Sequence, residues 1–161
     1  MLDRFYDGIE FRGVAQSDVE ELAAGASVPV WNGLTTEWHP TQMLADILTV
    51  QENFNYDIKG KTLVFMGDAA NNVARSLMVV CAKLGLNFVA CGPKENMPAA
   101  DLVETCEAIA AEHGCTIKLT EDGKDACTGA DVIYTDARGA TGQPAGAGDK
   151  RTTRDPPSPA T

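Results

Sequence analysis

Short apolar segments alternate with helix-forming segments from residue 62 onward, and this alternation limits the chain to few folds. The pattern predicts strands at residues 62–66, 86–91, 116–119 and 131–135, with helices at 72–84 and 98–113 between them. Gly85 is expected to end the first of these helices and Pro98 to begin the second. Strands separated by helices normally lie parallel in one sheet. We therefore predict an α/β fold with a parallel, Rossmann-like sheet in this part of the chain.

The residues before this region form a shorter unit. The pattern predicts, in order, a helix at 17–24, a strand at 28–31, a helix from 40 to about 54 and a polar hinge at 55–61. Ser17 and Glu20 have the spacing of a capping box at the start of the first helix, and Gly25 is expected to end it. A chain of 161 residues suffices for one core, or for two half-domains that share a hinge helix.

The helix predicted at 40–54 begins within the tetrad His39-Pro40-Thr41-Gln42. Proline has a fixed φ and no N–H group, so Pro40 suits the first helical position. The N–H groups of the first turn then point outward at the positive end of the helix dipole, where a phosphate or carbonyl oxygen binds readily. Taken alone, the pattern favours the simpler alternative, which is a surface histidine that caps the helix.

The charge balance excludes some classes of partner. The formal net charge is −10, whereas nucleic acids and anionic membranes bind basic surfaces, so we expect neither as a partner. No apolar stretch reaches the length of a membrane span, and no basic segment precedes an apolar one at the N-terminus. The expected location is therefore the cytoplasm.

The cysteines and histidines show no metal-binding pattern. The chain has five cysteines without a C-x-x-C pair, and the odd number favours reduced, buried thiols over a disulfide framework or a zinc site. His39 and His113 are the two histidines. His113 is predicted to lie at a helix end just before Gly114, where a cation complements the helix dipole, so we expect it to be structural. We predict no metal site.

Several segments resemble those of one enzyme family. They are Tyr-Asp-Gly-Ile-Glu-Phe-Arg-Gly at 6–13, Val-Pro-Val-Trp-Asn-Gly-Leu at 28–34, Glu-Trp-His-Pro-Thr-Gln-Met-Leu-Ala-Asp at 37–46, Leu-Val-Phe-Met-Gly-Asp-Ala-Ala-Asn-Asn at 63–72 and Ala-Asp-Val-Ile-Tyr-Thr-Asp at 130–136. In this order and spacing they resemble the ornithine carbamoyltransferases, in the aspartate/ornithine carbamoyltransferase superfamily, over residues 1–136. The His-Pro-Thr-Gln tetrad is shared with aspartate carbamoyltransferases, whereas Trp-Asn-Gly-Leu and Gly-Asp with Asn-Asn resemble the ornithine branch.

The resemblance implies transfer of a carbamoyl group from carbamoyl phosphate to L-ornithine, giving L-citrulline and phosphate in arginine biosynthesis or the urea cycle. It implies that Arg12 and His39 are catalytic, with Arg12 on carbamoyl phosphate and His39 donating to its carbonyl oxygen. Gln42 would hold the amino end of the carbamoyl group. Asn72 and Asp136 would bind the amino-acid part of ornithine. The implied fold joins the end of a carbamoyl-phosphate-binding domain, through a hinge helix, to an incomplete ornithine-binding domain.

Some of these residues also have simpler structural interpretations. Arg12 could be a solvated arginine at a strand edge, and Asn71 or Asn72 could simply cap the following helix. Gly67-Asp68-Ala69-Ala70 lacks the G-x-G-x-x-G spacing, so we expect no nicotinamide or flavin. Members of this family act without metal or organic cofactor and form trimers, which the resemblance implies for an intact relative.

The chain also departs from the family pattern at both ends. The family's Ser-Thr-Arg-Thr-Arg loop would precede residue 6, and its Val-Trp-Val-Ser-Met-Gly and His-Cys-Leu-Pro segments would follow residue 136; none of these is found. Residues 139–161 contain no Val, Leu, Ile, Met or aromatic residue, so we expect a disordered tail outside the family, and we hypothesise a shifted reading frame just after residue 136. The upstream DNA tests this hypothesis, which fails if no alternative frame restores the missing segment.

The expected organisation is therefore the end of a carbamoyl-phosphate-binding domain at 1–54, a hinge at 55–61, part of an ornithine-binding domain at 62–138 and the tail. We expect this chain alone to be inactive. The alternatives are a non-catalytic fragment or pseudogene product, or a carbamoyltransferase for a related amine such as putrescine.

Overall fold

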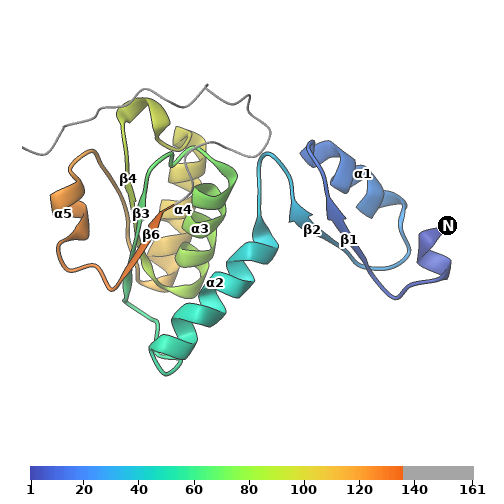
Figure 1. The fold of residues 1–161 in the computed structure, drawn as a ribbon, viewed down its shortest axis with the longest axis horizontal. Coiled ribbons are helices and arrows are strands. Elements are labelled where there is room, and N and C mark those ends of the chain that lie inside the picture. Colours follow the sequence, from blue (N-terminus) through green and yellow to red (C-terminus); the bar gives the residue numbers. More distant parts are fainter. Residues whose placement is uncertain (136–161) are drawn as a thin grey trace, which may run out of the picture.

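A computed structural model describes residues 1–135 of the chain. Two parallel sheets are joined by a long helix (Figure 1). The elements in chain order are η1 (Leu2–Arg4), β1 (Ile9–Arg12), α1 (Gln16–Gly25), β2 (Val30–Leu34), α2 (Pro40–Asn53), β3 (Thr62–Met66), α3 (Asn72–Leu84), β4 (Asn87–Cys91), η2 (Lys94–Asn96), α4 (Ala100–His113), β5 (Ile117–Thr120), α5 (Gly123–Cys127) and β6 (Val132–Thr135). None of the helices in this part of the chain combines the length and the apolar character that crossing a membrane requires.

The first sheet has two parallel strands, β1 and β2, with Ile9 opposite Val30. The register shifts between Phe11 and Arg12, so that Arg12 lies opposite Leu34 rather than Gly33. Helix α1 connects the two strands and packs against β2. The strand predicted at 28–31 thus begins and ends later, and β1 was not predicted.

The capping box predicted for α1 is wrong. The helix begins one residue earlier, with Ala15 as its N-cap residue and no side-chain hydrogen bond to the first turn. The side chain of Gln16 instead donates to Glu20 Oε1 at 3.1 Å. Glu20 therefore pairs with the residue four positions earlier on the same helix face, and this contact replaces the reciprocal bonds of a capping box.

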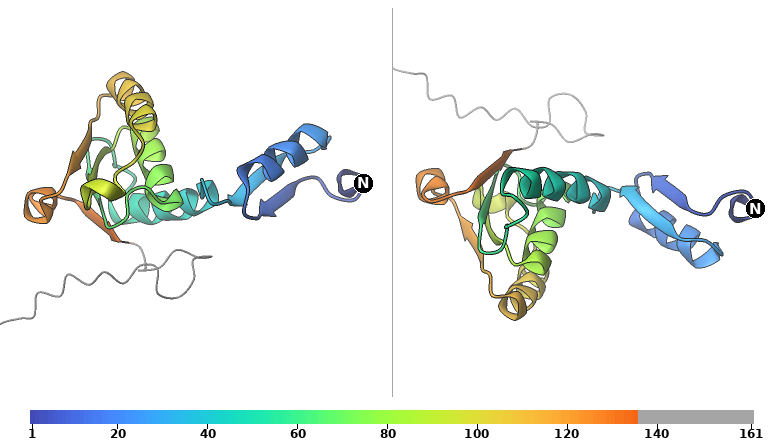
Figure 2. Two further views of the ribbon diagram at one scale, coloured as in Figure 1. Left: turned by 90° about the horizontal axis from the view of Figure 1, so that it is seen from above. Right: turned by 90° about the horizontal axis from the view of Figure 1, so that it is seen from below.

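The second sheet has the strand order β5-β4-β3-β6, and all neighbouring strands are parallel. Figure 2 shows α3 and α4 on one side of this sheet and α5 on the other. The parallel sheet predicted from the alternating pattern is therefore confirmed. The central strand β3 carries apolar side chains toward both faces, because the sheet is covered on both sides.

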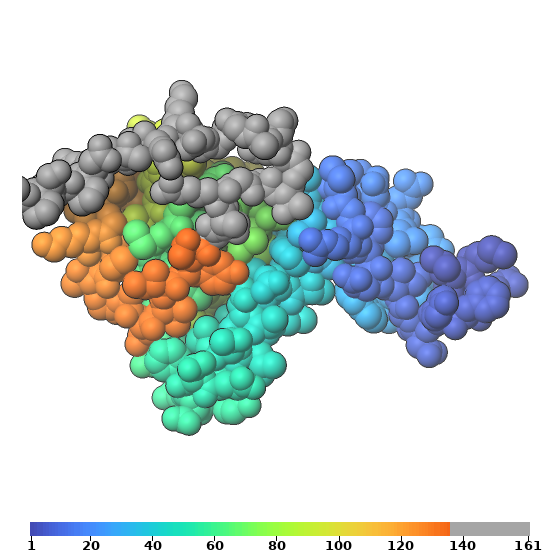
Figure 3. Space-filling view, viewed as in Figure 1, coloured from blue at the N-terminus to red at the C-terminus, as the bar shows by residue number. Residues whose placement is uncertain are grey.

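Helix α2 packs into the main core of the second sheet. Its buried residues Met43, Ile47 and Val50 belong to one cluster with the core of β3, β4 and α3. The largest fully buried side chains in this cluster are Phe65, Phe88, Leu63, Leu77 and Met78. A smaller cluster on the opposite face contains Val64, Val89, Cys91 and Ala126. Figure 3 shows α2 in cyan between the N-terminal unit in blue and the rest of the second unit in green to orange.

The helix ends follow local chemistry closely. Helix α3 has the predicted bounds, and Gly85 after it has φ +78°, a left-handed conformation that glycine adopts without steric cost. Helix α4 ends at His113, with the following glycine also left-handed, but it begins at Ala100 rather than at Pro98. The five-residue helix α5 was not predicted. Asp136 and the predicted tail at 139–161 lie outside the described residues.

Candidate active site

The loop between β2 and α2 is organised around the buried side chain of Thr35. The backbone N–H of Thr35 donates to the Trp38 carbonyl oxygen at 2.8 Å. In return, the N–H of Trp38 donates to Thr35 Oγ1 at 3.1 Å. Thr35 Oγ1 also donates to Gln16 Oε1 at 2.9 Å, which ties the loop to α1. These bonds close a tight turn, and His39 follows this turn as the residue directly before α2.

His39 occupies the N-cap position of α2, and Pro40 is its first residue, as predicted. The His39 side chain makes no capping hydrogen bond, so the simple surface-cap alternative does not describe it. The first N–H groups of an α-helix have no partner within the helix. Thr41 Oγ1 donates to the Gly33 carbonyl oxygen at 2.9 Å, which fixes this turn against β2. The helix start is therefore held rigidly beside the bulge in the first sheet.

The electrostatic surroundings of His39 favour a neutral imidazole. Burial lowers the pKa of this side chain, and the Arg12 guanidinium lowers it further. The Asp46 carboxylate and a hydrogen bond to the Gly33 backbone act in the opposite direction but do not outweigh these effects. Nδ1 of His39 is buried and has no hydrogen-bond partner among residues 1–135. A neutral imidazole is able to donate one hydrogen bond and accept another.

Gln42 lies on the first turn of α2, where its side-chain Nε2 donates to Asp46 Oδ1 at 2.8 Å. A carboxylate accepts hydrogen bonds, so this contact orients the amide nitrogen toward Asp46 and frees the amide oxygen as an acceptor. Oδ2 of Asp46 is buried without a hydrogen-bond partner in the described part of the chain. Asp46 thus positions Gln42 and was not predicted as a site residue. Its spacing of four residues from Gln42 on one helix was the available signal.

Arg12 is exposed at the carboxyl end of β1. Its charge acts on His39, as the lowered pKa of the imidazole indicates, so the structure brings these two predicted residues into one electrostatic environment. The exposure also matches the alternative reading of a solvated strand-edge arginine. Both descriptions apply to the same side chain, because an arginine that binds a small anion must be accessible to it.

The two asparagines at the start of α3 have different roles in the fold. Asn71 is the N-cap residue, and its Oδ1 accepts from the N–H of Ala74 at 2.8 Å. Asn72 is the first helical residue, and its Nδ2 donates to the Thr35 carbonyl oxygen at 2.7 Å. The helix-cap alternative is therefore correct for Asn71 and not for Asn72. Asn72 connects the second sheet to the loop that carries His39. The remaining predicted ligand, Asp136, lies outside the described residues.

Two further residues of α3 contact the same loop and were not predicted. The Arg75 guanidinium carbon lies 4.5 Å from the centre of the Trp38 ring, a cation–π contact. Ser76 Oγ accepts from the backbone N–H of His39 at 2.9 Å. The signal that was available is spacing, because Ser76 lies four residues after Asn72 and so faces the same side of α3.

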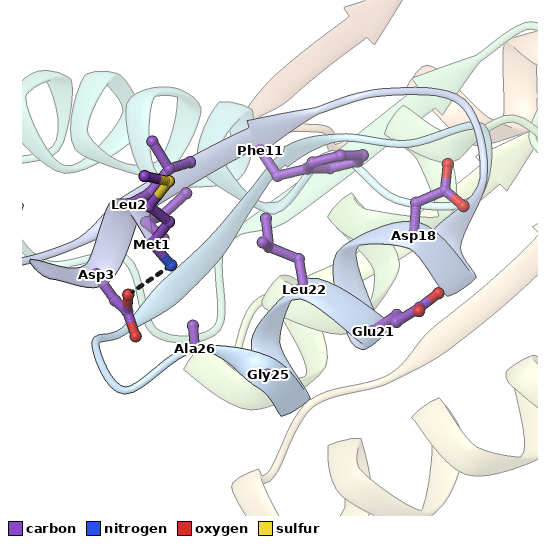
Figure 4. A pocket seen from close by; sticks show the side chains of 10 residues that line it. Met1, Leu2, Asp3, Phe11, Asp18, Glu21, Leu22, Gly25 and Ala26 are labelled. Atoms are coloured by element: carbon purple, nitrogen blue, oxygen red, sulfur yellow. Dashed lines mark ion pairs between the residues drawn. The ribbon is translucent and has the colours of Figure 1, made fainter.

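A separate cavity of about 600 Å³ lies in the N-terminal unit, between η1, β1 and α1 (Figure 4). Its wall is apolar and its rim is acidic; the lining residues include Leu2, Ile9, Phe11, Leu22, Asp18 and Glu21. None of the predicted site residues lines it. A small anion such as a phosphate is not matched by acidic groups, so we place the candidate site at the start of α2 and not in this cavity.

Metal ligands are not gathered anywhere in the described part of the chain. No group of three or more histidine, cysteine, aspartate or glutamate side chains within residues 1–135 is arranged to hold an ion. All five cysteines are free thiols. Burial raises the pKa of the Cys81 thiol well above its ordinary value, which keeps it protonated.

Comparisons with known proteins match both parts of the chain. Residues 1–52 match the carbamoyl-P binding domain of aspartate/ornithine carbamoyltransferases, and residues 59–154 match the Asp/Orn binding domain of the same family. The second match reaches beyond residue 136, where the resemblance in the sequence was seen to end.

Individual relatives agree with these matches. The chain is 56% identical over 145 residues to a catabolic ornithine carbamoyltransferase of Mycoplasma capricolum subsp. capripneumoniae, which covers 90% of the chain and 46% of that protein. It is 58% identical over 136 residues to a catabolic ornithine carbamoyltransferase of Streptococcus gordonii, covering 84% of the chain and 40% of that protein.

Solved structures extend the agreement to the fold. The ornithine carbamoyltransferase of Pyrococcus furiosus aligns with a TM-score of 0.80 at 43% identity, over 84% of this chain and 43% of that one. The chain thus spans less than half the length of the relatives it matches. Because both domains match in their family order, this chain belongs to the aspartate/ornithine carbamoyltransferase family.

Proposed function

We propose that this chain is part of an ornithine carbamoyltransferase, which transfers a carbamoyl group from carbamoyl phosphate to L-ornithine and forms L-citrulline and phosphate. The names of the relatives and the match to the Asp/Orn binding domain support ornithine as the acceptor. The observation that carries the proposal is the arrangement at the start of α2, where His39 is the N-cap residue and Gln42 lies on the first turn, whose N–H groups have no partner within the helix.

Each proposed role fits the chemistry of its residue. Arg12 supplies a guanidinium for the phosphate oxygens. The imidazole of His39 donates to the carbonyl oxygen, which becomes negatively charged when the amine attacks the carbonyl carbon. The free amide oxygen of Gln42, oriented by Asp46, accepts from the amino group of the carbamoyl moiety. Asn72 and Asp136 are proposed to hold the amino-acid part of ornithine.

The proposed role of His39, which is to donate a hydrogen bond to the carbonyl oxygen, requires only the neutral imidazole. Burial and the Arg12 charge lower its pKa, so the imidazole is neutral near pH 7 and offers a hydrogen bond rather than a full charge. The attacking amine must also be neutral, because a protonated amine has no lone pair for the attack on the carbonyl carbon. The electrostatics of the loop therefore support hydrogen-bond donation to the developing oxyanion.

The cellular setting of this activity is also a proposal. We place it in arginine metabolism in the cytoplasm, in a homotrimer, with no nucleic acid or membrane partner and no metal or organic cofactor. The relatives include enzymes named catabolic as well as enzymes without that label.

A chimera tests the proposal. Residues 1–135 would replace the corresponding segment of the Mycoplasma capricolum relative, which supplies the segments that this chain does not match. Citrulline formation by the chimera, lost in His39→Ala and retained in His113→Ala, is the expected result. His113 is a matched control because it lies at the end of α4, away from the β2–α2 loop. A folded chimera that makes no citrulline would refute the proposal.

Two controls complete the experiment. The 161-residue chain alone is expected to form no measurable citrulline, because each missing preorganised donor costs about 2.7–4 kcal/mol of transition-state stabilisation. Putrescine is then offered to the chimera in place of ornithine. If carbamoyl transfer to putrescine is faster than transfer to ornithine, putrescine becomes the proposed acceptor.

A further inference from the structure

Ser76 is a buried serine in the second turn of α3, with 5% of its surface exposed. Its Oγ donates to the Asn72 carbonyl oxygen at 2.7 Å, a common bond for a serine inside a helix. Oγ also accepts from the backbone N–H of His39 at 2.9 Å, from a segment 37 residues earlier in the chain. The second bond joins α3 to the start of α2, and the formation of α3 does not require it.

The β2–α2 loop is held by α3 at both of its ends. At the first end, the Asn72 side chain donates to the Thr35 carbonyl oxygen at 2.7 Å. At the second end, Ser76 accepts from His39. Because Asn72 and Ser76 are one helical turn apart on α3, the two bonds fix both the position and the direction of the loop. The ring contact of Arg75 with Trp38 lies between them.

The imidazole of His39 depends on this backbone anchor. No capping bond holds its side chain, and its Nδ1 has no hydrogen-bond partner within residues 1–135. The charged groups that act on the ring are Arg12 on β1 and Asp46 on α2, while Arg75 on α3 lies over the preceding residue. The ring position therefore follows from the Gly33 backbone, to which the side chain bonds, and from where the His39 backbone is placed. Ser76 is the group of α3 that places the His39 backbone.

We propose that Ser76 is a positioning residue that fixes His39 through its backbone and couples the helix of the ornithine half-site to the carbamoyl-phosphate half-site. Its relevance to catalysis rests on the proposed function, whereas its effect on His39 does not. Removal of the Ser76 hydroxyl leaves the partly buried N–H of His39 without an acceptor. The loop then shifts so that this N–H bonds to water. The imidazole then becomes more solvated, and its orientation beside Arg12 and Asp46 is lost.

The test uses the full 161-residue chain and the NMR signals of its two histidines. In Ser76→Ala, the His39 ring signals should shift and the pKa of His39 should rise toward its ordinary value, because the ring becomes more solvated. The signals of His113 should not change, because it lies at the far end of another helix. An unchanged His39 titration in a folded Ser76→Ala chain would overturn the proposal.

Matched variants separate the hydroxyl from packing. Thr105 makes the same type of bond to the carbonyl four residues earlier, at 2.8 Å on α4, but it is exposed, so Thr105→Ala should leave His39 unchanged. Ser76→Thr and Ser76→Val have the same shape and differ only in the hydroxyl. The threonine variant should restore the wild-type His39 titration and the valine variant should not. Equal titrations in these two variants would show that packing is responsible and would overturn the proposal.

The same substitution in the chimera separates this proposal from the proposed function. If the chimera makes citrulline, Ser76→Ala should lower kcat by at least about tenfold, which corresponds to about 1.4 kcal/mol, with a smaller change in KM for ornithine. Unchanged kcat together with an altered His39 titration would overturn the catalytic part of the proposal. A chimera that makes no citrulline but shows the altered titration refutes the proposed function and supports the positioning of His39 by Ser76.

Discussion

Replacement of Gly92 by alanine would strain the edge of the second sheet that carries Asn72. Gly92 directly follows β4 and lies against Gly67, which follows β3. A Cβ atom on Gly92 would lie 2.2 Å from the Gly67 carbonyl oxygen, whereas ordinary contact begins at 3.4 Å, so the two backbones must separate by about 1.2 Å. Both backbones are tied down, because the N–H of Gly67 donates to the Cys91 carbonyl at 2.9 Å and that of Gly92 to the Thr120 carbonyl at 3.2 Å.

The expected loss of stability follows from these contacts. Overpacking of a tight site costs about 1–3 kcal/mol, and each backbone hydrogen bond that breaks costs about 0.5–1.5 kcal/mol. The free energy of unfolding should therefore fall by about 1.5–4.5 kcal/mol if the strain breaks one of the two bonds. With a urea slope of about 2 kcal/mol per molar, the unfolding midpoint should fall by about 1–2 M.

Urea unfolding followed by circular dichroism measures this change. Gly25→Ala is the matched control, because a Cβ atom at Gly25 meets nothing within 4 Å and the residue is the last of α1. That substitution should leave stability unchanged or raise it by up to about 1 kcal/mol, the difference in helix propensity. A Gly92→Ala midpoint equal to the wild-type midpoint would refute the close approach of the two backbones.

Three other changes test the start of α3, the imidazole and the thiols. Asn71→Ala removes the acceptor for the N–H of Ala74 and should lower the free energy of unfolding by about 1 kcal/mol in urea titrations, whereas Asn71→Asp should retain most of it. The folded-state pKa of His39 is below its ordinary value of 6.5, so below that pH the unfolded chain binds the proton first. Stability should therefore fall as the pH drops below 6.5, and His39→Gln should flatten this dependence in thermal melts; an unchanged slope would contradict the assignment. Cys127 is partly exposed and should react first with Ellman's reagent, while Cys81 is buried with a raised pKa and should react only on unfolding; rapid modification of Cys81 in the folded chain would be the contrary result.

The elements with strong apolar cores were predictable from the sequence. Strand Thr62–Met66 and helix Asn72–Leu84 have the predicted bounds, because four consecutive apolar residues follow Thr62 in the strand and Gly85 gives the helix a defined end. The short elements were not predictable in the same way. Strand Ile9–Arg12 has four residues, of which two are charged, and helix Gly123–Cys127 is only five residues long. Such segments are set by their neighbours in space, which periodicity does not reveal.

The sequence placed the motif residues of the candidate site but not their supporting contacts. Pro40 marked the start of α2 as expected, whereas the roles of His39, Gln42 and Asn72 came from the family resemblance and stay predictions. Thr35 and Ser76 were missed: the spacing of Ser76 from Asn72 places both on one face of α3 but does not show what that face contacts, and Thr35 lies in a loop without a periodic pattern. Their role depends on contacts over 37 residues of chain, which only the folded structure brings together.

Helix α2 explains why a single loop unites the two half-sites. Its apolar face packs into the core of the second sheet, so His39 at its start is placed by that core. Arg12 belongs to the first sheet, and its guanidinium still lowers the pKa of His39. Thr41 on α2 also donates to the Gly33 carbonyl oxygen of β2, so the start of α2 is bonded to the first sheet as well as to α3. The loop therefore brings residues of both half-sites together because it is held by both sheets at once.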